Sequence, residues 1–448
     1  MKLARSISVI TLLSVSSGAF ASVPLPSGTT TRPPTSVVIK VTPEEAASVE
    51  ASIKAPKIAM AGVPLPRPTG VSLHPAVTPD LDTPPPPPRT PKLNVGQFHA
   101  RIHGALKDET RGYALGLRKG GAPVLSLAWD VARARLDGNK AWTLDTRMHI
   151  GQASEHITAI AMVRMLEERG ISLDARIGDY LPSYWTVGAN NEGVTFRELI
   201  THRSGLDRIW ADYATVRAEF AAYNNDRNKP SWSPANYGLL RVLSGTVTGA
   251  VNKDAWFAAP IAINPATERA FNDGMWDAKT TDAFLSYART KVFAPSGVSA
   301  VTTVPVGNPA LAYPTKWDTL PGWDSGDLKR WLGALAFRLS VNEVLDVMST
   351  YRRKGTILSA TRAKQLIEAN YGLLEPIETP AGKIHWQFGF YTDGYRDGSG
   401  GTFSSAEQAI LMYLPDDMEL VVLVNSYLYP SQKKLDEVVR AAYVASLQ

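Results

Sequence analysis

Strand-like sequence patterns lie at both ends of the globular part of this 448-residue chain, and helical patterns fill the middle. Two apolar runs flank Lys119-Gly120-Gly121 and predict a β-hairpin. Asp416-Asp417 predicts a turn between the last two strands. Segments far apart in sequence must therefore meet in one antiparallel sheet, with a helical lobe inserted between them, which is an α+β architecture. The predicted strand regions are 112–129, 385–391, 404–414 and 420–426.

The helix expected after the first hairpin covers residues 154–168. Its apolar positions Ile157, Ile160 and Met165 share one face, and Gly170 follows its end. Helical patterns continue to about residue 369, and a last helix is expected over residues 432–447. The globular domain is therefore assigned to residues 94–448.

The N-terminus has the features of a secretory signal peptide. A basic start with Lys2 and Arg5 precedes an apolar stretch over residues 7–15, and Ala19-Phe20-Ala21 forms a small-x-small cleavage site. We expect residues 1–21 to be removed and the protein to be exported, either to the periplasm or outside the cell. The alternative is an uncleaved anchor helix, although the apolar run is short for a bilayer span. No later stretch is long and apolar enough to be a transmembrane segment.

Residues 22–93 are rich in proline and show no lasting hydrophobic period. We predict a disordered linker or tether, in which Pro84 to Pro88 forms a stiff polyproline II segment. A short helix over Thr42 to Ile53 is compatible with Pro43 in its first turn. The functional alternative is a docking arm for a wall component or another partner.

Composition excludes several kinds of site. The sequence contains no cysteine, so disulfides, thiolate metal sites and a lipid-modified cysteine are excluded. The formal net charge is +5, and no dense Lys/Arg stripe suggests nucleic-acid binding. His149 and His156 have no carboxylate cluster at metal-ligand spacing, so we expect neither a metal nor a cofactor.

Several motifs, in order, carry a family resemblance. Residues 145–151 read D-T-R-M-H-I-G, residues 179–182 read D-Y-L-P, and residues 194–206 read V-T-F-R-E-L-I-T-H-R-S-G-L. They resemble the serine β-lactamase and penicillin-binding protein family, which includes class C β-lactamases, D-alanyl-D-alanine carboxypeptidases and related esterases. The resemblance extends from about Val95 to the C-terminus. It implies the β-lactamase/penicillin-binding (transpeptidase-like) fold, with an antiparallel sheet flanked by helices and a cleft beside a helical lobe.

The resemblance also identifies the positions of the family's first catalytic element, S-x-x-K. In the family, the serine is the nucleophile and the lysine, one helical turn later, takes its proton. The flanking matches fix these positions as Gln152 and Glu155. A carboxamide is not a usable nucleophile here, and Glu155 inverts the charge of the lysine.

The other two elements are altered as well. Trp232-Ser233-Pro234 occupies the place of Y-x-N. The tyrosine is replaced by a tryptophan, which has no ionisable group, and the asparagine by a proline, whose side chain has neither a donor nor an acceptor. Counting back from the last strands places Arg396-Asp397-Gly398 at K-T-G, with Gly398 as the motif glycine. We expect Arg396 to face Glu155 across the cleft within salt-bridge distance.

Other candidates have simpler structural interpretations. Ser154 is a weak nucleophile candidate, because its base would have to be the apolar Ile157. A simpler role is to cap the helix N-terminus or to pack as the small residue of the family does. A rebuilt hydrolytic site using Glu155 and His156 is opposed by their opposite directions on a helix, and His202 is expected to be structural. Four tryptophans are candidates either for a sugar-binding groove or for the core: Trp210, Trp232, Trp323 and Trp331.

The sequence thus leaves three functions open. The first is an exported β-lactamase-related protein that has lost serine acyl transfer and binds a peptidoglycan fragment or a cell-wall protein. The second is an active hydrolase of amide or ester bonds that uses rebuilt groups. The third is a tethering module acting through the Pro-rich arm. The candidate ligand contacts are Gln152, Glu155, Trp232 and Arg396.

Overall fold

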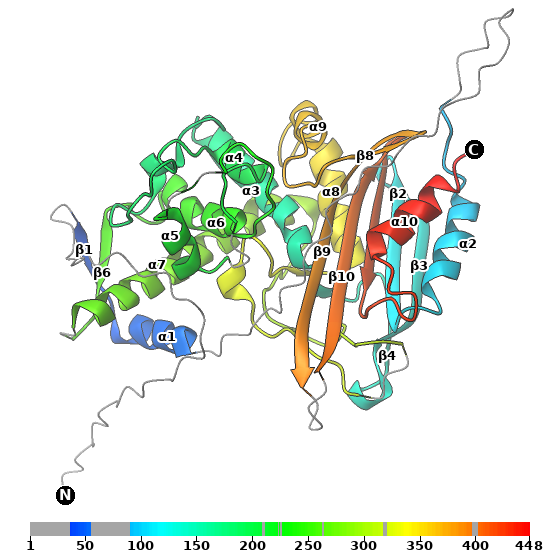
Figure 1. Ribbon diagram of the computed structural model, residues 1–448, viewed down its shortest axis with the longest axis horizontal. Helices are drawn as coiled ribbons and strands as arrows, with labels where there is room; N and C mark the ends of the chain where they lie inside the picture. The colour runs from blue at the N-terminus through cyan, green and yellow to red at the C-terminus, as the bar shows by residue number, and fades with distance from the viewer. Residues whose placement is uncertain are drawn as a thin grey trace, which may run out of the picture. The chain divides into compact units, whose positions relative to one another are not determined.

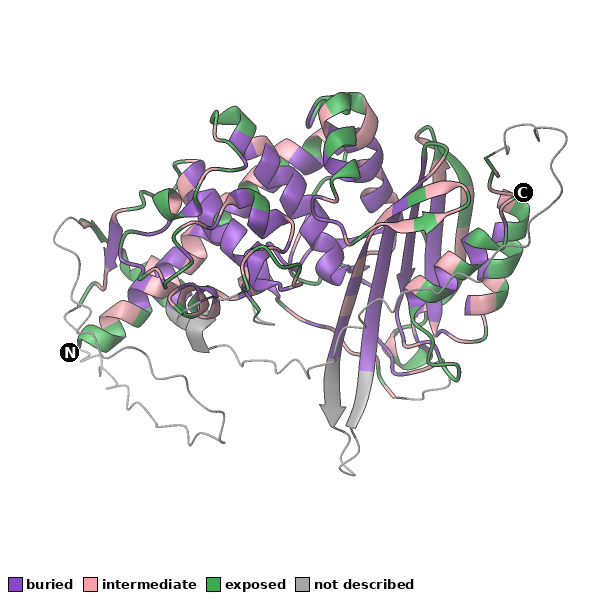
Figure 2. Cartoon of the chain, turned by 45° about the horizontal axis from the view of Figure 1, so that its top comes forward, coloured by how far each residue is buried: buried purple, intermediate pink, exposed green. Residues whose placement is uncertain are grey.

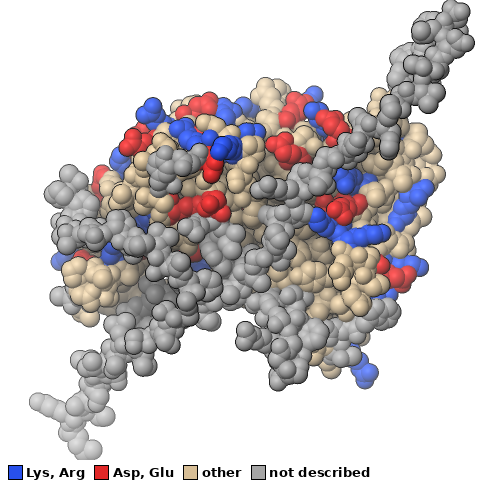
Figure 3. All heavy atoms as spheres, viewed as in Figure 1, with Lys and Arg blue, Asp and Glu red and all other residues tan. Residues whose placement is uncertain are grey.

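The computed structural model describes residues 36–54, 90–207, 211–222, 224, 226–261, 264–316, 320–396 and 402–448. The expected signal peptide and the Pro84–Pro88 run lie outside these residues. Among the described helices, none combines the length and apolarity needed to cross a bilayer. On the face shown in Figure 3, acidic and basic side chains are intermixed wherever the residues are described.

A seven-stranded sheet is built from both ends of the domain, as predicted (Figure 1). Its strand order is β4-β3-β2-β11-β10-β9-β8, and every neighbouring pair is antiparallel. Gly120 and Gly121 adopt positive φ at the predicted hairpin turn. The strands are β2 (Gly112–Lys119), β3 (Ala122–Arg133), β4 (Lys140–Ala141), β8 (Ile377–Thr379), β9 (Gly382–Arg396), β10 (Thr402–Leu414) and β11 (Met418–Val424).

Each face of the sheet is covered by helices, because alternate strand residues point to opposite sides. On β11, Val422 points into a core shared with α2 and α10, while Val421 and Leu423 point into the core of the helical lobe. Figure 2 shows buried residues gathered where the helices meet the sheet. The helices of the first face are α2 (Val95–Leu106) and α10 (Leu435–Val444).

The helical lobe is inserted between β4 and β8, as the sequence predicts. Its longest helix, α7, packs against α3, α5 and α6. A short pair formed by β5 and β7 lies at the start of the lobe. The elements are β5 (Met148–His149), α3 (Ser154–Glu168), α4 (Phe196–Ile200), α5 (Tyr213–Phe220), α6 (Ala235–Val247), β6 (Ala255–Ala258), α7 (Pro265–Ala288), β7 (Arg338–Leu339), α8 (Val341–Ser349) and α9 (Ala360–Glu368).

Part of the Pro-rich arm is folded, which corrects the prediction of a disordered linker over residues 22–93. β1 (Val37–Lys40) pairs in parallel with β6, and α1 (Pro43–Lys54) packs on α7. The short helix expected over Thr42 to Ile53 is therefore present. Ala46 and Val49, one turn apart, are buried, and their burial against the lobe offsets the entropy cost of ordering the segment.

Candidate functional site

Two glycines bring strand β9 against the turn that precedes α3. Gly151 has φ +55°, and a Cβ there would lie 2.8 Å from the amide nitrogen of Phe390. A Cβ on Gly389 would lie 1.8 Å from the carbonyl oxygen of Ile150. No side chain fits at either position, so the backbone of β9 passes directly beside the 3₁₀ turn Gly151–Ala153.

Gln152 uses this close approach to bind the strand. Its side-chain oxygen accepts a hydrogen bond from the backbone N–H of Phe390, 2.8 Å away, and the residue is only 7% exposed. A backbone N–H that points to a carbonyl oxygen beside a helix start is the arrangement used in oxyanion holes. Here the carbonyl belongs to the protein's own carboxamide.

Glu155 is the centre of a buried hydrogen-bond network. It is fully buried, and its Oε2 atom accepts from Gln387 Nε2 at 3.0 Å, His202 Nε2 at 3.3 Å and Trp232 Nε1 at 3.3 Å. Burial raises the pKa of Glu155, and His202 and the other donors oppose this shift. The second oxygen, Oε1, has no hydrogen-bond partner among the described residues.

The surroundings of His202 fix its tautomer. Its Nδ1 atom accepts from the backbone N–H of Ser233 at 3.3 Å and lies 3.2 Å from the amide nitrogen of Asn236. Nδ1 is therefore the acceptor, and the Nε2 hydrogen points to Glu155. His202 thus holds the carboxylate in place from the helical lobe, and the structural role expected for it agrees with these contacts.

Comparison with known proteins assigns the family. The Beta-lactamase family model matches residues 98–444. The chain belongs to the β-lactamase family. Among curated proteins, none matches the sequence.

Solved structures support the fold at low sequence identity. A class C β-lactamase from Rhodobacter sphaeroides is 18% identical with a TM-score of 0.51, covering 78% of this chain and 98% of that chain. FmtA from Staphylococcus aureus is 14% identical with a TM-score of 0.55, covering 78% and 87%. EstCE1, a hydrolase with promiscuous acyltransferase activity, is 16% identical with a TM-score of 0.53, covering 78% and 99%. The β-lactamase/penicillin-binding fold predicted from the motifs is confirmed.

The predicted pairing of Arg396 with Glu155 is wrong. Gln387 faces Glu155 instead, and Arg396 lies nine residues further along β9, which is about 30 Å of extended strand. We therefore place the third element at Gln387-Phe388-Gly389, the stretch of β9 that faces Glu155. The Arg396 side chain and Gly398 lie outside the described residues.

The sequence itself explains why Arg396 was predicted in the third element. The glycine-rich run after Arg396 offered a glycine at the expected distance from the last strands, whereas Gln387-Phe388-Gly389 lacks both the lysine and the threonine of K-T-G. The usable signal was Gly389 itself. An isolated glycine inside a strand marks a point where another backbone approaches closely.

Trp232 lies in the network as its family position implies, and Ser154 is packed in the core rather than at the helix cap. Ser154 is fully buried, and its hydroxyl accepts from the backbone N–H of Phe337 at 3.4 Å. It is not an N-cap, because the cap position of α3 is Ala153. Pro234 is the N-cap residue of α6 and makes no side-chain cap. None of these residues provides a nucleophile beside Glu155.

His156 points away from the network of Glu155. Its Nε2 atom lies 2.8 Å from the hydroxyl of Tyr413, and its Nδ1 lies 3.3 Å from the carbonyl oxygen of Tyr371. Burial lowers the pKa of His156 to about 4. A rebuilt site that joins Glu155 to His156 therefore has no support in the geometry. In the described part of the chain, no group of three His, Asp or Glu residues is arranged to hold a metal ion.

The tryptophans do not form one groove. Trp331 is buried, and Trp323 stacks on Tyr391 with ring centroids 5.7 Å apart. Trp232 contacts Glu155, and Trp210 lies outside the described residues. The core interpretation thus holds for Trp331, and Trp232 is the one of the three described tryptophans that is bonded to Glu155.

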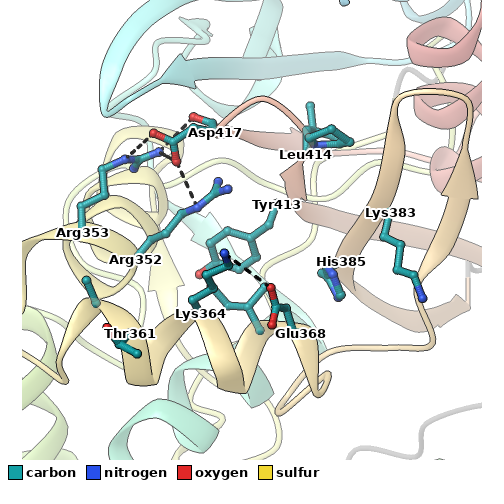
Figure 4. A pocket seen from close by; sticks show the side chains of 13 residues that line it. Arg352, Arg353, Thr361, Lys364, Glu368, Lys383, His385, Tyr413, Leu414 and Asp417 are labelled. Atoms are coloured by element: carbon teal, nitrogen blue, oxygen red, sulfur yellow. Dashed lines mark hydrogen bonds and ion pairs between the residues drawn. The ribbon is translucent and has the colours of Figure 1, made fainter. Parts of the chain in front are cut away.

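A hollow of about 530 Å³ lies away from this site, between α9 and the start of β9 (Figure 4). Its arginines, Arg352 and Arg353, are both bound to Asp417 and to the buried Glu419. These ion pairs hold the turn between β10 and β11 against the helix that follows α8. The two arginines of this hollow therefore have a structural role.

Proposed function

We propose that this chain is a non-acylating member of the β-lactamase family that is exported and acts by binding. The observation that carries the proposal is the set of contacts on Glu155. This residue replaces the family's lysine, and two of its hydrogen-bond donors, Trp232 and Gln387, occupy the second and third motif positions. All three elements have therefore changed together into one network.

The network lacks the parts that acyl transfer requires. Gln152 offers no nucleophilic oxygen, and Glu155 cannot supply the positive charge that activates a serine. Loss of the nucleophile alone can reduce kcat by about 10⁶ in a serine protease. The carboxamide of Gln152 also occupies the backbone N–H of Phe390, where a substrate carbonyl would bind.

The replaced site holds one oxygen of its new carboxylate by several hydrogen bonds, which favours retention for another role. A buried carboxylate is costly unless it is hydrogen-bonded, and Glu155 accepts three N–H groups at one oxygen. The site has therefore been rebuilt around a new charge, and the fold has been kept. Gln152 is buried against β9, so the partly exposed Trp232 is the side chain of this group that is available to contact a ligand.

A fragment of cell-wall peptide is the ligand class that the family suggests. The structural relatives include a protein described as an octameric penicillin-binding protein homologue from Pyrococcus abyssi, and the expected signal peptide would place this chain where wall fragments occur. Binding is tested by a thermal shift with purified muropeptides. A shift in the wild type that is lost in Trp232→Ala supports the proposal. The absence of any shift at millimolar muropeptide contradicts the ligand class.

The active-hydrolase alternative makes an opposite prediction for covalent labelling. The relatives include EstCE1, which is described as a hydrolase, so the fold alone does not decide. An acyl adduct with a β-lactam would support this alternative. The tether alternative is weakened by the docking of β1 and α1, because this part of the Pro-rich arm is bound to the helical lobe.

A further inference from the structure

An aromatic strip lies along β9, on the face of the sheet opposite the Glu155 network. Trp386, Phe388 and Phe390 alternate along the strand and are partly exposed. The rings of Phe388 and Phe390 stack with centroids 6.0 Å apart, and Tyr427 meets Phe390 at 5.6 Å. Three consecutive outward-facing aromatic residues on one strand form a flat, apolar surface.

The helices of this face leave the strip partly uncovered. α10 packs on β10, the neighbour of β9, and α2 packs on β3, near the opposite edge of the sheet (Figure 1). Trp386 and Phe388 contact the edge of the core beneath these helices without being enclosed by it. The strip therefore has room for another segment beside α10.

The chain itself brings a suitable segment to the start of this strand. Thr90 and Ala381, the residue before β9, line the same hollow of about 200 Å³. Hydrogen bonds from Lys92 and Asn94 to the C-terminal residues Gln448 and Ser446 fix the chain there. Pro84 to Pro88 ends only two residues before Thr90.

The lengths agree. Pro84 precedes Thr90 by six residues, which as a polyproline II helix would span about 19 Å. Five residues of strand separate Ala381 from Trp386, which is about 17 Å. A proline run that leaves Thr90 along β9 therefore reaches Trp386 and approaches Phe388.

We propose that the aromatic strip is the docking surface for the proline run Pro84–Pro88 of the same chain. Aromatic surfaces bind polyproline II segments because pyrrolidine rings stack on flat side chains, and the segment is already extended, so little entropy is lost on binding. This inference does not depend on the proposed function. The second part of the Pro-rich arm would then lie on the sheet, whereas β1 and α1 hold the first part on the helical lobe.

The absence of cysteine from the chain allows a direct distance measurement. Nitroxide labels are placed in the full chain at Thr83→Cys and at Lys383→Cys, which is an exposed position on β9. Double electron–electron resonance then gives the distribution of distances between the two labels. We expect one narrow population that broadens in the Trp386→Ala/Phe388→Ala variant. Trp129→Ala, which removes an exposed aromatic residue from β3, is the matched control and should leave the population narrow.

A second variant protects the test against misfolding of the sheet. Replacing Pro84–Pro88 by a Gly/Ser segment of equal length leaves β9 untouched, and it should broaden the distribution and speed trypsin cleavage after Arg89 severalfold. A wild-type distribution as broad as that of the Gly/Ser variant would overturn the proposal. So would unchanged cleavage at Arg89, because the run would then not be held on the strip.

Discussion

The amide nitrogen of Gln387 donates a hydrogen bond to the carboxylate of Glu155 across 3.0 Å. Glu155 stands where the family has a lysine on the central helix, and we place Gln387 where the family has a lysine or a histidine on the strand. One charge has been inverted and the other removed, and the two replacements bind each other. Each replacement thus gives the other a hydrogen-bond partner in a buried position, where an unpaired polar group is costly.

Inverting the charge again should destabilise the fold. Glu155→Lys would place an ammonium group, fully buried, against three N–H donors, so we expect a loss of about 3–5 kcal/mol in the free energy of unfolding. Glu155→Gln keeps an acceptor oxygen and should cost about 1–2 kcal/mol. Urea unfolding measures both. Equal stability of the lysine variant and the wild type would show that the network is not what holds this site.

Restoring the serine alone should not restore acylation. In Gln152→Ser, the nucleophile position has a hydroxyl, but the residue one turn later is still Glu155, which cannot lower the serine pKa. We expect no covalent β-lactam adduct by intact mass in this variant. An adduct on the new serine would mean that another group serves as the base.

The close contact of the two glycine backbones predicts a steep cost for a single methyl group. Gly389→Ala would put a Cβ 1.8 Å from the carbonyl oxygen of Ile150, and we expect a loss of about 3 kcal/mol or more through backbone displacement. Gly104→Ala is the matched control, because nothing lies within 4 Å of its Cβ in α2. The control should gain about 0.5–1 kcal/mol in urea unfolding. Similar effects in both variants would contradict the observed register of β9.

Acid should weaken the fold through His156. Burial lowers the pKa of His156 from 6.5 to about 4, so between these values the unfolded chain takes up a proton that the folded chain does not. Stability from this group is full above pH 6.5 and falls as the pH drops, by about 2 kcal/mol at pH 5. The difference between urea unfolding at pH 7 and pH 5 should shrink in His156→Gln. An unchanged difference would assign the acid sensitivity to other groups.

Much of the fold could be predicted from the sequence, and the losses at the first two motif elements could be located. The run over residues 194–206 and the sequences on either side of Gln152 and Glu155 are local patterns. They remain recognisable although the catalytic residues have been replaced. Gln387 was missed because its identity matters only through a contact with a residue 232 positions away. The docking of β1 was missed for the same reason, since its partner β6 lies more than 200 residues later.

The docked arm gives a further test. Val49→Asp would place a charge in the buried contact between α1 and α7, so we expect hydrogen exchange over residues 37–54 to rise at least tenfold. Ser48→Asp adds the same charge at an exposed position of α1 and should leave exchange unchanged. Protection that persists in the Val49 variant would show that the arm is held elsewhere.

Covalent labelling tests the central claim most directly. The purified chain is incubated with a fluorescent penicillin beside an active class C β-lactamase, and both are followed by gel fluorescence and intact mass. With Gln152 in the nucleophile position, we predict that the chain keeps its unmodified mass while the control enzyme is acylated or turns the compound over. A penicilloyl adduct on any residue of the chain would contradict the account.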